Sequence, residues 1–178
     1  MTGVQTCALP ILKEIGSDVG TIPVSNPDYA VEARTRESYL GTARIEYLSS
    51  PEQPIPNKEI PFTAPADVYP NSFAYSGRWT LSEEYAMPAK NAELIFRFDA
   101  KDVFLVMRPK TPGATIRIRV LLDGKPPSVL SGADVKNGVV TVDSDRLYKL
   151  IKLDKGGEHI LKLQFIDGNV DLYAFTFG

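Results

Sequence analysis

The sequence predicts an all-β protein, and specifically an antiparallel β-sandwich or jelly roll. Apolar and polar residues alternate with a period of two in several short segments, from Ser76 to the C-terminus. Turn-forming pairs of glycine, aspartate and asparagine separate these segments, and helical spacing is almost absent. Hydrophobic residues make up 43% of the chain, which is enough for two packed inner faces.

Residues 1–11 read MTGVQTCALPI and match the translation of a common sequencing-library adapter. We therefore expect this stretch to be an adapter-derived artefact that takes no part in the fold. Cys7, the only cysteine, lies within it. The rest of the chain can form neither a disulfide nor a CxxC redox pair.

Residues 12–34 are expected to be the remnant of a preceding domain together with a linker. Leu12–Gly20 is typical of the last turn of a helix, with Lys13 near its C-terminal end and glycine as its stop. Thr21–Arg34 contains two prolines and mixed polar residues, which is typical of a linker. Residues 35–178 are then the folded β-sandwich module.

Prolines concentrate in the segment Ser49–Asn71. Proline cannot donate to a β-ladder, so this segment predicts loops and short edge strands. Beyond it, Glu93–Asp99 alternates, and Val103–Met107 is so apolar that we expect burial on both faces. Thr115–Leu122 is the cleanest strand, because its isoleucines and valine point one way and its arginines the other.

The C-terminal part predicts further strands joined by turns. The predicted strands are Val139–Val142, Arg146–Leu153, Glu158–Ile166 and Val170–Phe177. The turns are expected at Asp123-Gly124, Asn137-Gly138, Gly156-Gly157 and Asp167-Gly168-Asn169. In the last strand, Leu172, Ala174 and Thr176 are expected to oppose Tyr173, Phe175 and Phe177.

Composition excludes several classes of function. The net charge of −2 gives no bulk field for nucleic acid or an anionic membrane surface. No apolar run approaches the roughly 20 residues of a membrane helix. With one histidine and one cysteine the chain cannot build a multi-histidine or multi-cysteine metal site, and nothing points to a cofactor.

An ordered series of short motifs spans residues 35–178. The series is Tyr39-Leu40-Gly41, Gly77-Arg78-Trp79, Phe96–Val103, Asp123-Gly124-Lys125-Pro126, Gly132-Ala133-Asp134-Val135, Arg146–Ile151 and Ala174–Gly178. It resembles the C-terminal domain that follows the thioredoxin-like domain in DipZ-type cytochrome c biogenesis proteins. The resemblance implies a galactose-binding-like jelly roll, similar to a carbohydrate-binding module, on the extracytoplasmic side of the membrane. It also implies an upstream thioredoxin-like domain as partner.

Aromatic and polar residues supply the candidate ligand site. Sugar rings stack on flat aromatic side chains while polar groups bind their hydroxyls. The candidates are Trp79, Asp123, Asp134, Arg146 and Tyr148. For Trp79 the competing interpretation is core packing, the usual role of a lone tryptophan in a β-sandwich. For Tyr148 the two interpretations are balanced.

Other side chains offer weaker chemistry. Asp143 and Asp145 could form a glycosidase pair, but turn capping is the commoner role. Either Asp99 and Asp102 or Asp143 and Asp145 could supply oxygens to a calcium ion, but solvated turn aspartates are the commoner case. His159 is expected on an exposed strand. Arg117 and Arg119 are expected to form a solvated outer face rather than an anion site.

These observations favour a non-catalytic accessory module of an extracytoplasmic thioredoxin-like protein, with cell-envelope carbohydrate as its ligand. The alternative is a docking domain without a sugar site, which packs on the thioredoxin-like domain or on protein partners. A hydrolase is the third alternative, and it requires two facing carboxylates in a cleft.

Overall fold

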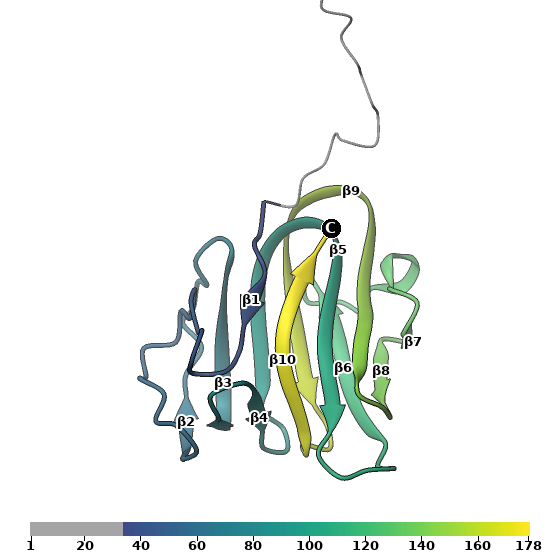
Figure 1. Cartoon of the computed structure of the whole chain (residues 1–178). Helices are drawn as coiled ribbons and strands as arrows, with labels where there is room; N and C mark the ends of the chain where they lie inside the picture. Colours follow the sequence, from purple (N-terminus) through teal and green to yellow (C-terminus); the bar gives the residue numbers. More distant parts are fainter. Residues whose placement is uncertain (1–33) are drawn as a thin grey trace, which may run out of the picture.

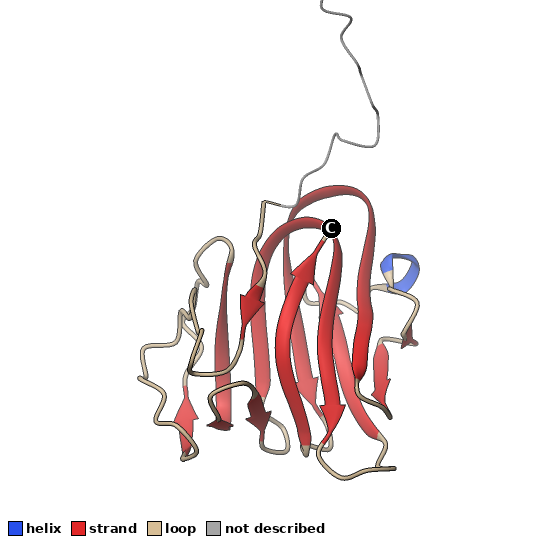
Figure 2. Cartoon of the chain, in the orientation of Figure 1, coloured by secondary structure: helices blue, strands red, loops and turns tan. Residues whose placement is uncertain are grey.

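The computed structural model describes residues 34–178, so residues 1–11 and all of the 12–34 segment except Arg34 lie outside the described residues. The predicted helix end at Leu12–Gly20 lies outside them as well. The described chain consists of strands and loops, with one short 3₁₀ helix (Figure 2). Its elements are β1 (Ser38–Tyr39), β2 (Glu59–Phe62), β3 (Ser72–Leu81), β4 (Ala86–Pro88), β5 (Glu93–Pro109), β6 (Ile116–Leu122), the 3₁₀ helix η2 (Ser128–Leu130), β7 (Val135–Lys136), β8 (Val139–Val142), β9 (Arg146–Phe165) and β10 (Val170–Phe177).

One ten-stranded sheet folds over itself to make the two layers. Strands β5 and β9 pair with each other along their length and bend together over one end of the molecule (Figure 1). The first half of β5 pairs with β3, and the second half pairs with β10 in the other layer. Every pairing between strands is antiparallel. The prediction of an all-β antiparallel sandwich is confirmed.

The inner faces of the two layers form one apolar core. On β6, Ile116, Ile118 and Val120 are buried while Arg117 and Arg119 are exposed, which confirms the predicted alternation. The largest fully buried side chains are aromatic, and they are Trp79, Tyr75, Tyr148, Phe73, Phe96, Phe98, Phe165 and Phe175.

The predicted turn at Gly156-Gly157 is wrong. The sequence predicts Arg146–Leu153 and Glu158–Ile166 as separate strands, but β9 runs as one strand from Arg146 to Phe165. Its ladder with β5 reaches the pair Ala100 and Gly157 and resumes, after a shift in register, at Asp102 and Lys152. The glycines therefore serve a bend within a strand, where the absence of a side chain lets the backbone curve over the core.

Two further strand predictions need correction. Glu93–Asp99 and Val103–Met107 belong to the single strand β5, and within the second segment only alternate residues are fully buried. In β10, a register shift between Leu172 and Phe175 places both side chains in the core. A β-bulge of this kind reverses the alternation, and sequence periodicity does not reveal it.

The remaining turns and the proline-rich segment agree with the sequence. Asp123-Gly124 and Asn137-Gly138 each have two successive positive φ values, between 50° and 78°, as a type I′ turn requires. The segment Ser49–Asn71 contains only β2, which pairs with β3 alone. That edge position tolerates Pro61 within the strand.

Candidate functional site

Trp79 has no exposed surface, and it is a core residue rather than a ligand platform. Its indole ring lies 4.4 Å from the Tyr75 ring and 5.3 Å from the Phe165 ring, between ring centroids. Its Nε1–H donates to the carbonyl oxygen of Ser76 at 3.0 Å. The prediction of Trp79 as a ligand-binding residue is therefore wrong, because the inward face of β3 packs it between the layers.

Asp134, Arg146 and Tyr148 do come together, as a compact cluster at the start of β9. Arg146 Nη2 donates to Asp134 Oδ1 at 2.9 Å, and its guanidinium lies 3.8 Å from the centre of the Tyr148 ring. The second carboxylate oxygen of Asp134 accepts the backbone N–H of Lys149 at 2.7 Å. This arrangement fixes the chain before β7 against β9.

Tyr148 is also fully buried, and its hydroxyl is occupied within the protein. The phenol oxygen accepts the backbone N–H groups of Asp143 and Ser144, both at 3.1 Å. The Tyr148 hydroxyl in turn donates to the carbonyl oxygen of Ser144, its nearest acceptor, at 2.8 Å. A tyrosine that binds backbone groups a few residues upstream is a known corner device of β-sandwiches. The ring of Tyr148 therefore cannot stack on a sugar in this structure.

Asp123 belongs to a different cluster. Its Oδ2 lies 2.7 Å from His159 Nδ1, and its Oδ1 accepts the backbone N–H of Ile160 at 2.9 Å. Partial burial by itself would raise the pKa of Asp123, but the hydrogen bonds from Ile160 and His159 outweigh it and lower the pKa. His159 is partly exposed on β9, close to the predicted setting.

The pKa of the Asp134 carboxylate provides a test of the structural role of this cluster. Burial by itself would raise its pKa, but hydrogen bonds from Arg146 and the Lys149 N–H lower it below the usual value of about 3.9. A carboxylate whose pKa is lower in the folded state than in the unfolded state stabilises the fold at pH values above its unfolded pKa. This stabilisation is lost as the pH falls through the folded pKa. We expect Asp134→Asn to be less stable than wild type at pH 7, and to lose less unfolding free energy between about pH 5 and pH 2.

Urea unfolding across this pH range measures the effect. Asp154→Asn is the matched control, because Asp154 is exposed on β9 and forms no hydrogen bond through its side chain within residues 34–178. The interpretation of a structural cluster fails if Asp134→Asn and Asp154→Asn have the same pH dependence.

Asp143, one member of the predicted acidic pair, is held within its own turn. Asp143 Oδ1 accepts the Ser144 hydroxyl at 3.0 Å and lies 3.2 Å from the Tyr148 hydroxyl, so this carboxylate is engaged in the turn. Within residues 34–178, no group of three or more histidine, cysteine, aspartate or glutamate side chains is placed to hold a metal ion. Nor does the described part of the chain contain a helix with the length and hydropathy to cross a membrane.

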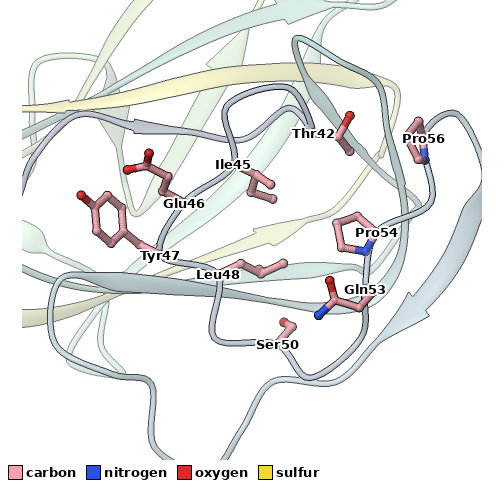
Figure 3. Close-up of a pocket in the computed structure, with 9 residues that line it drawn as sticks. All are labelled: Thr42, Ile45, Glu46, Tyr47, Leu48, Ser50, Gln53, Pro54 and Pro56. Carbon is pink, nitrogen blue, oxygen red and sulfur yellow. The ribbon is translucent and has the colours of Figure 1, made fainter.

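A groove of about 530 Å³ lies elsewhere, between two loop segments that precede β2 (Figure 3). Ile45, Leu48, Gln53 and Pro54 point into the space between the loops, and Tyr47 lies at one end with Glu46 (Figure 3). The full lining consists of Thr42, Ile45, Glu46, Tyr47, Leu48, Ser50, Gln53, Pro54 and Pro56. Apolar walls with a few polar groups are typical of small-molecule sites.

Hydrogen bonds to β3 and its flanking residues hold both loops in place. The backbone N–H of Thr42 donates to Ser82 at 2.8 Å, and the N–H of Asn57 donates to Leu81 at 2.7 Å, each to the carbonyl oxygen. The Ser50 hydroxyl is buried and exchanges hydrogen bonds with the backbone of Tyr75, at 2.9 and 3.1 Å. The groove is therefore fixed to the core rather than formed by unsupported loops.

Tyr47 is the exposed aromatic side chain of this groove, with 40% of its surface accessible. Its backbone φ is 61°, a left-handed conformation that is strained for a bulky residue. The carbonyl oxygen of Tyr47 accepts the N–H of Phe73, which holds the strained residue in place. Strained residues that the surroundings fix occur preferentially at functional sites. The sequence does not predict Tyr47 as a site residue, because nothing local indicates its φ or its exposure.

The comparisons with known proteins decide the family. The family described as "Thioredoxin like C-terminal domain" matches residues 35–178. The chain belongs to this family. The thioredoxin-like C-terminal domain has curated relatives in Protein DipZ of Mycobacterium bovis and Protein DipZ of Mycobacterium tuberculosis. Each is 30% identical over 122 residues, which are 67% of this chain and 17% of the relative. The chain thus spans about a sixth of the length of these relatives.

Solved structures with a similar fold include two family two carbohydrate esterases. The enzyme from Cellvibrio japonicus matches with a TM-score of 0.47 and 14% identity, over 59% of this chain and 30% of its own. The enzyme from Clostridium thermocellum, in complex with cellohexaose, matches with a TM-score of 0.48 and 18% identity, over 60% of this chain and 31% of its own.

Proposed function

We propose that this thioredoxin-like C-terminal domain is a non-catalytic module that binds carbohydrate through the groove at Thr42–Pro56. In the proposed parent protein the module follows a thioredoxin-like domain on the extracytoplasmic side of the membrane. Residues 12–34 are then the end of that domain and the linker. The family and its DipZ relatives support the accessory role.

The observation that carries the proposal is the exposed Tyr47 at the end of a supported groove. An aromatic face beside aliphatic walls can hold the C–H face of a sugar ring. Thr42, Gln53 and Glu46 provide hydroxyl, amide and carboxylate groups that can bind sugar hydroxyls. The groove volume lies in the range of small-ligand sites.

A non-catalytic role is supported by the state of the candidate carboxylates. Asp134 is bound to Arg146, Asp123 to His159 and Asp143 to its own turn. Among the groove residues Glu46 is the one acidic side chain, whereas glycoside hydrolysis uses a pair.

Affinity electrophoresis of the whole chain in gels that contain soluble polysaccharides tests the proposal. Tyr47→Ala is expected to weaken binding about tenfold, because it removes the aromatic face without touching the core. Tyr69→Ala is the matched control, since Tyr69 is 71% exposed and does not line the groove. The proposal fails if no polysaccharide retards the wild type, or if Tyr47→Ala is retarded as strongly as wild type.

A docking role is the second candidate, and exposed apolar side chains favour it. Ile55 and Tyr69 are 48% and 71% exposed on the segment between β1 and β3. Under this alternative, Ile55→Ser and Tyr69→Ser would weaken binding to a separately added thioredoxin-like domain of the parent protein. Polysaccharide binding would then be absent from the wild type.

A further inference from the structure

We infer that the groove continues past Tyr47 into a cationic pocket, so that the ligand is an anionic glycan. The inference rests on the proposed carbohydrate-binding function and specifies the chemical class of the ligand. A second pocket of about 260 Å³ is lined by Arg34, Arg36, Tyr47 and Asn71. Tyr47 lines both spaces and is therefore the wall that they share.

The second pocket presents hydrogen-bond donors. Arg36 is exposed and forms no ion pair with any residue of the described chain. The Arg34 side chain is 81% exposed and lies 3.4 Å from Asp99 Oδ2, too far for a strong hydrogen bond. Two guanidinium groups next to one carboxylate leave a net positive charge in the pocket.

Asn71 adds a neutral donor of fixed orientation. Its Oδ1 accepts the hydroxyl of Thr35 at 2.6 Å, and that hydroxyl oxygen in turn accepts the backbone N–H of Asp99 at 2.6 Å. Because the amide oxygen is used in this way, the amide nitrogen and its two N–H groups remain for a ligand. No hydrogen bond between residues 34–178 uses that nitrogen.

Planar guanidinium groups bind carboxylate and phosphate oxygens well. The adjacent groove differs in character, since its lining mixes apolar residues with neutral polar ones around Glu46. A polysaccharide that crosses Tyr47 would place a neutral sugar in the groove and a charged substituent against Arg36. This combination indicates an acidic glycan rather than a free anion, and the anionic group is a carboxylate or a phosphate.

Binding of the whole chain to one polysaccharide in two charge states tests the inference. Polygalacturonate and its fully methyl-esterified, neutral form share a backbone and test for recognition of a carboxylate. A phosphorylated mannan and unmodified mannan form the second pair and test for recognition of a phosphate. We expect wild type to bind one acidic form at least about tenfold more tightly than its neutral form, with a preference that decreases at high salt. The pair of polysaccharides that shows this preference identifies the charged group of the ligand as a carboxylate or a phosphate.

Arg36→Gln is expected to abolish the preference for the acidic form and to leave the affinity for the neutral form unchanged. Arg119→Gln is the control, because Arg119 is an exposed arginine on β6 that lines neither pocket. The inference is overturned if wild type binds both charge states equally, or if Arg36→Gln keeps the preference. Failure of wild type to bind any of the four polysaccharides instead overturns the proposed function together with this inference.

Discussion

Trp79→Ala is expected to lower the free energy of unfolding by about 3–5 kcal/mol. The substitution removes a side chain with no exposed surface that contacts both Tyr75 and Phe165, and it leaves a cavity between the layers. It also leaves the Ser76 carbonyl oxygen without the indole donor. Because domains are stable by only about 5–15 kcal/mol, the variant is expected to unfold at a much lower urea concentration.

Urea unfolding of the whole chain measures this loss, with two companion variants. Trp79→Phe keeps an aromatic ring but loses the Nε1–H donor, and we expect a cost of about 1–3 kcal/mol. Tyr69→Ala removes a largely exposed ring and should change stability by less than about 0.5 kcal/mol. A nearly unchanged stability of Trp79→Ala would show that the indole is not part of the core.

Gly132→Ala is expected to lower the free energy of unfolding by an amount similar to Trp79→Ala, for a steric reason. A Cβ atom at residue 132 would overlap the carbonyl oxygen of Lys149 and lie 2.8 Å from the carbonyl carbon of Leu150. These are backbone atoms of β9, so no side-chain rotation can relieve the overlap. The segment that carries Asp134 must then separate from β9 and break the hydrogen bond from the Gly132 N–H to the Leu150 carbonyl. We expect a loss of about 3 kcal/mol or more.

Gly157→Ala is the matched control for this effect. A Cβ atom at residue 157 would meet only the His159 ring, at 3.6 Å, an ordinary contact. Since β9 continues through this position, alanine there should change stability by less than about 1 kcal/mol, and in the stabilising direction. Thermal unfolding of both variants provides the comparison. Equal losses in the two would refute the close approach of residue 132 to β9.

The sequence predicted the elements of this fold better than their continuity. Arg117 and Arg119 alternate with buried isoleucines, and the exposed arginine face follows directly from the strand period. The Gly156-Gly157 pair has the composition of a turn, but it lies inside β9, at an irregularity in the register with β5. The pairs on both sides of this irregularity belong to one strand, and local composition does not reveal that continuity.

The candidate site was predicted only in part. The sequence indicates Asp134, Arg146 and Tyr148 as polar and aromatic candidates, and the structure brings them together. These side chains bind one another rather than a ligand, however, because the Tyr148 ring is buried beneath the Arg146 guanidinium. Residue type indicates which side chains can interact with a sugar, whereas exposure depends on which face of the sandwich each one reaches.

The sequence by itself determined the all-β class, the I′ turns and the family. Strand period, turn residues and an ordered set of motifs are local properties, and they can be recognised without knowledge of the partner strands. The tertiary structure alone decided that Trp79 lies in the core and that Tyr47 stands exposed between a neutral groove and a cationic pocket. The physical reason is that burial and concavity arise from contacts between segments distant in sequence, such as the ladder between Glu93 and Gln164.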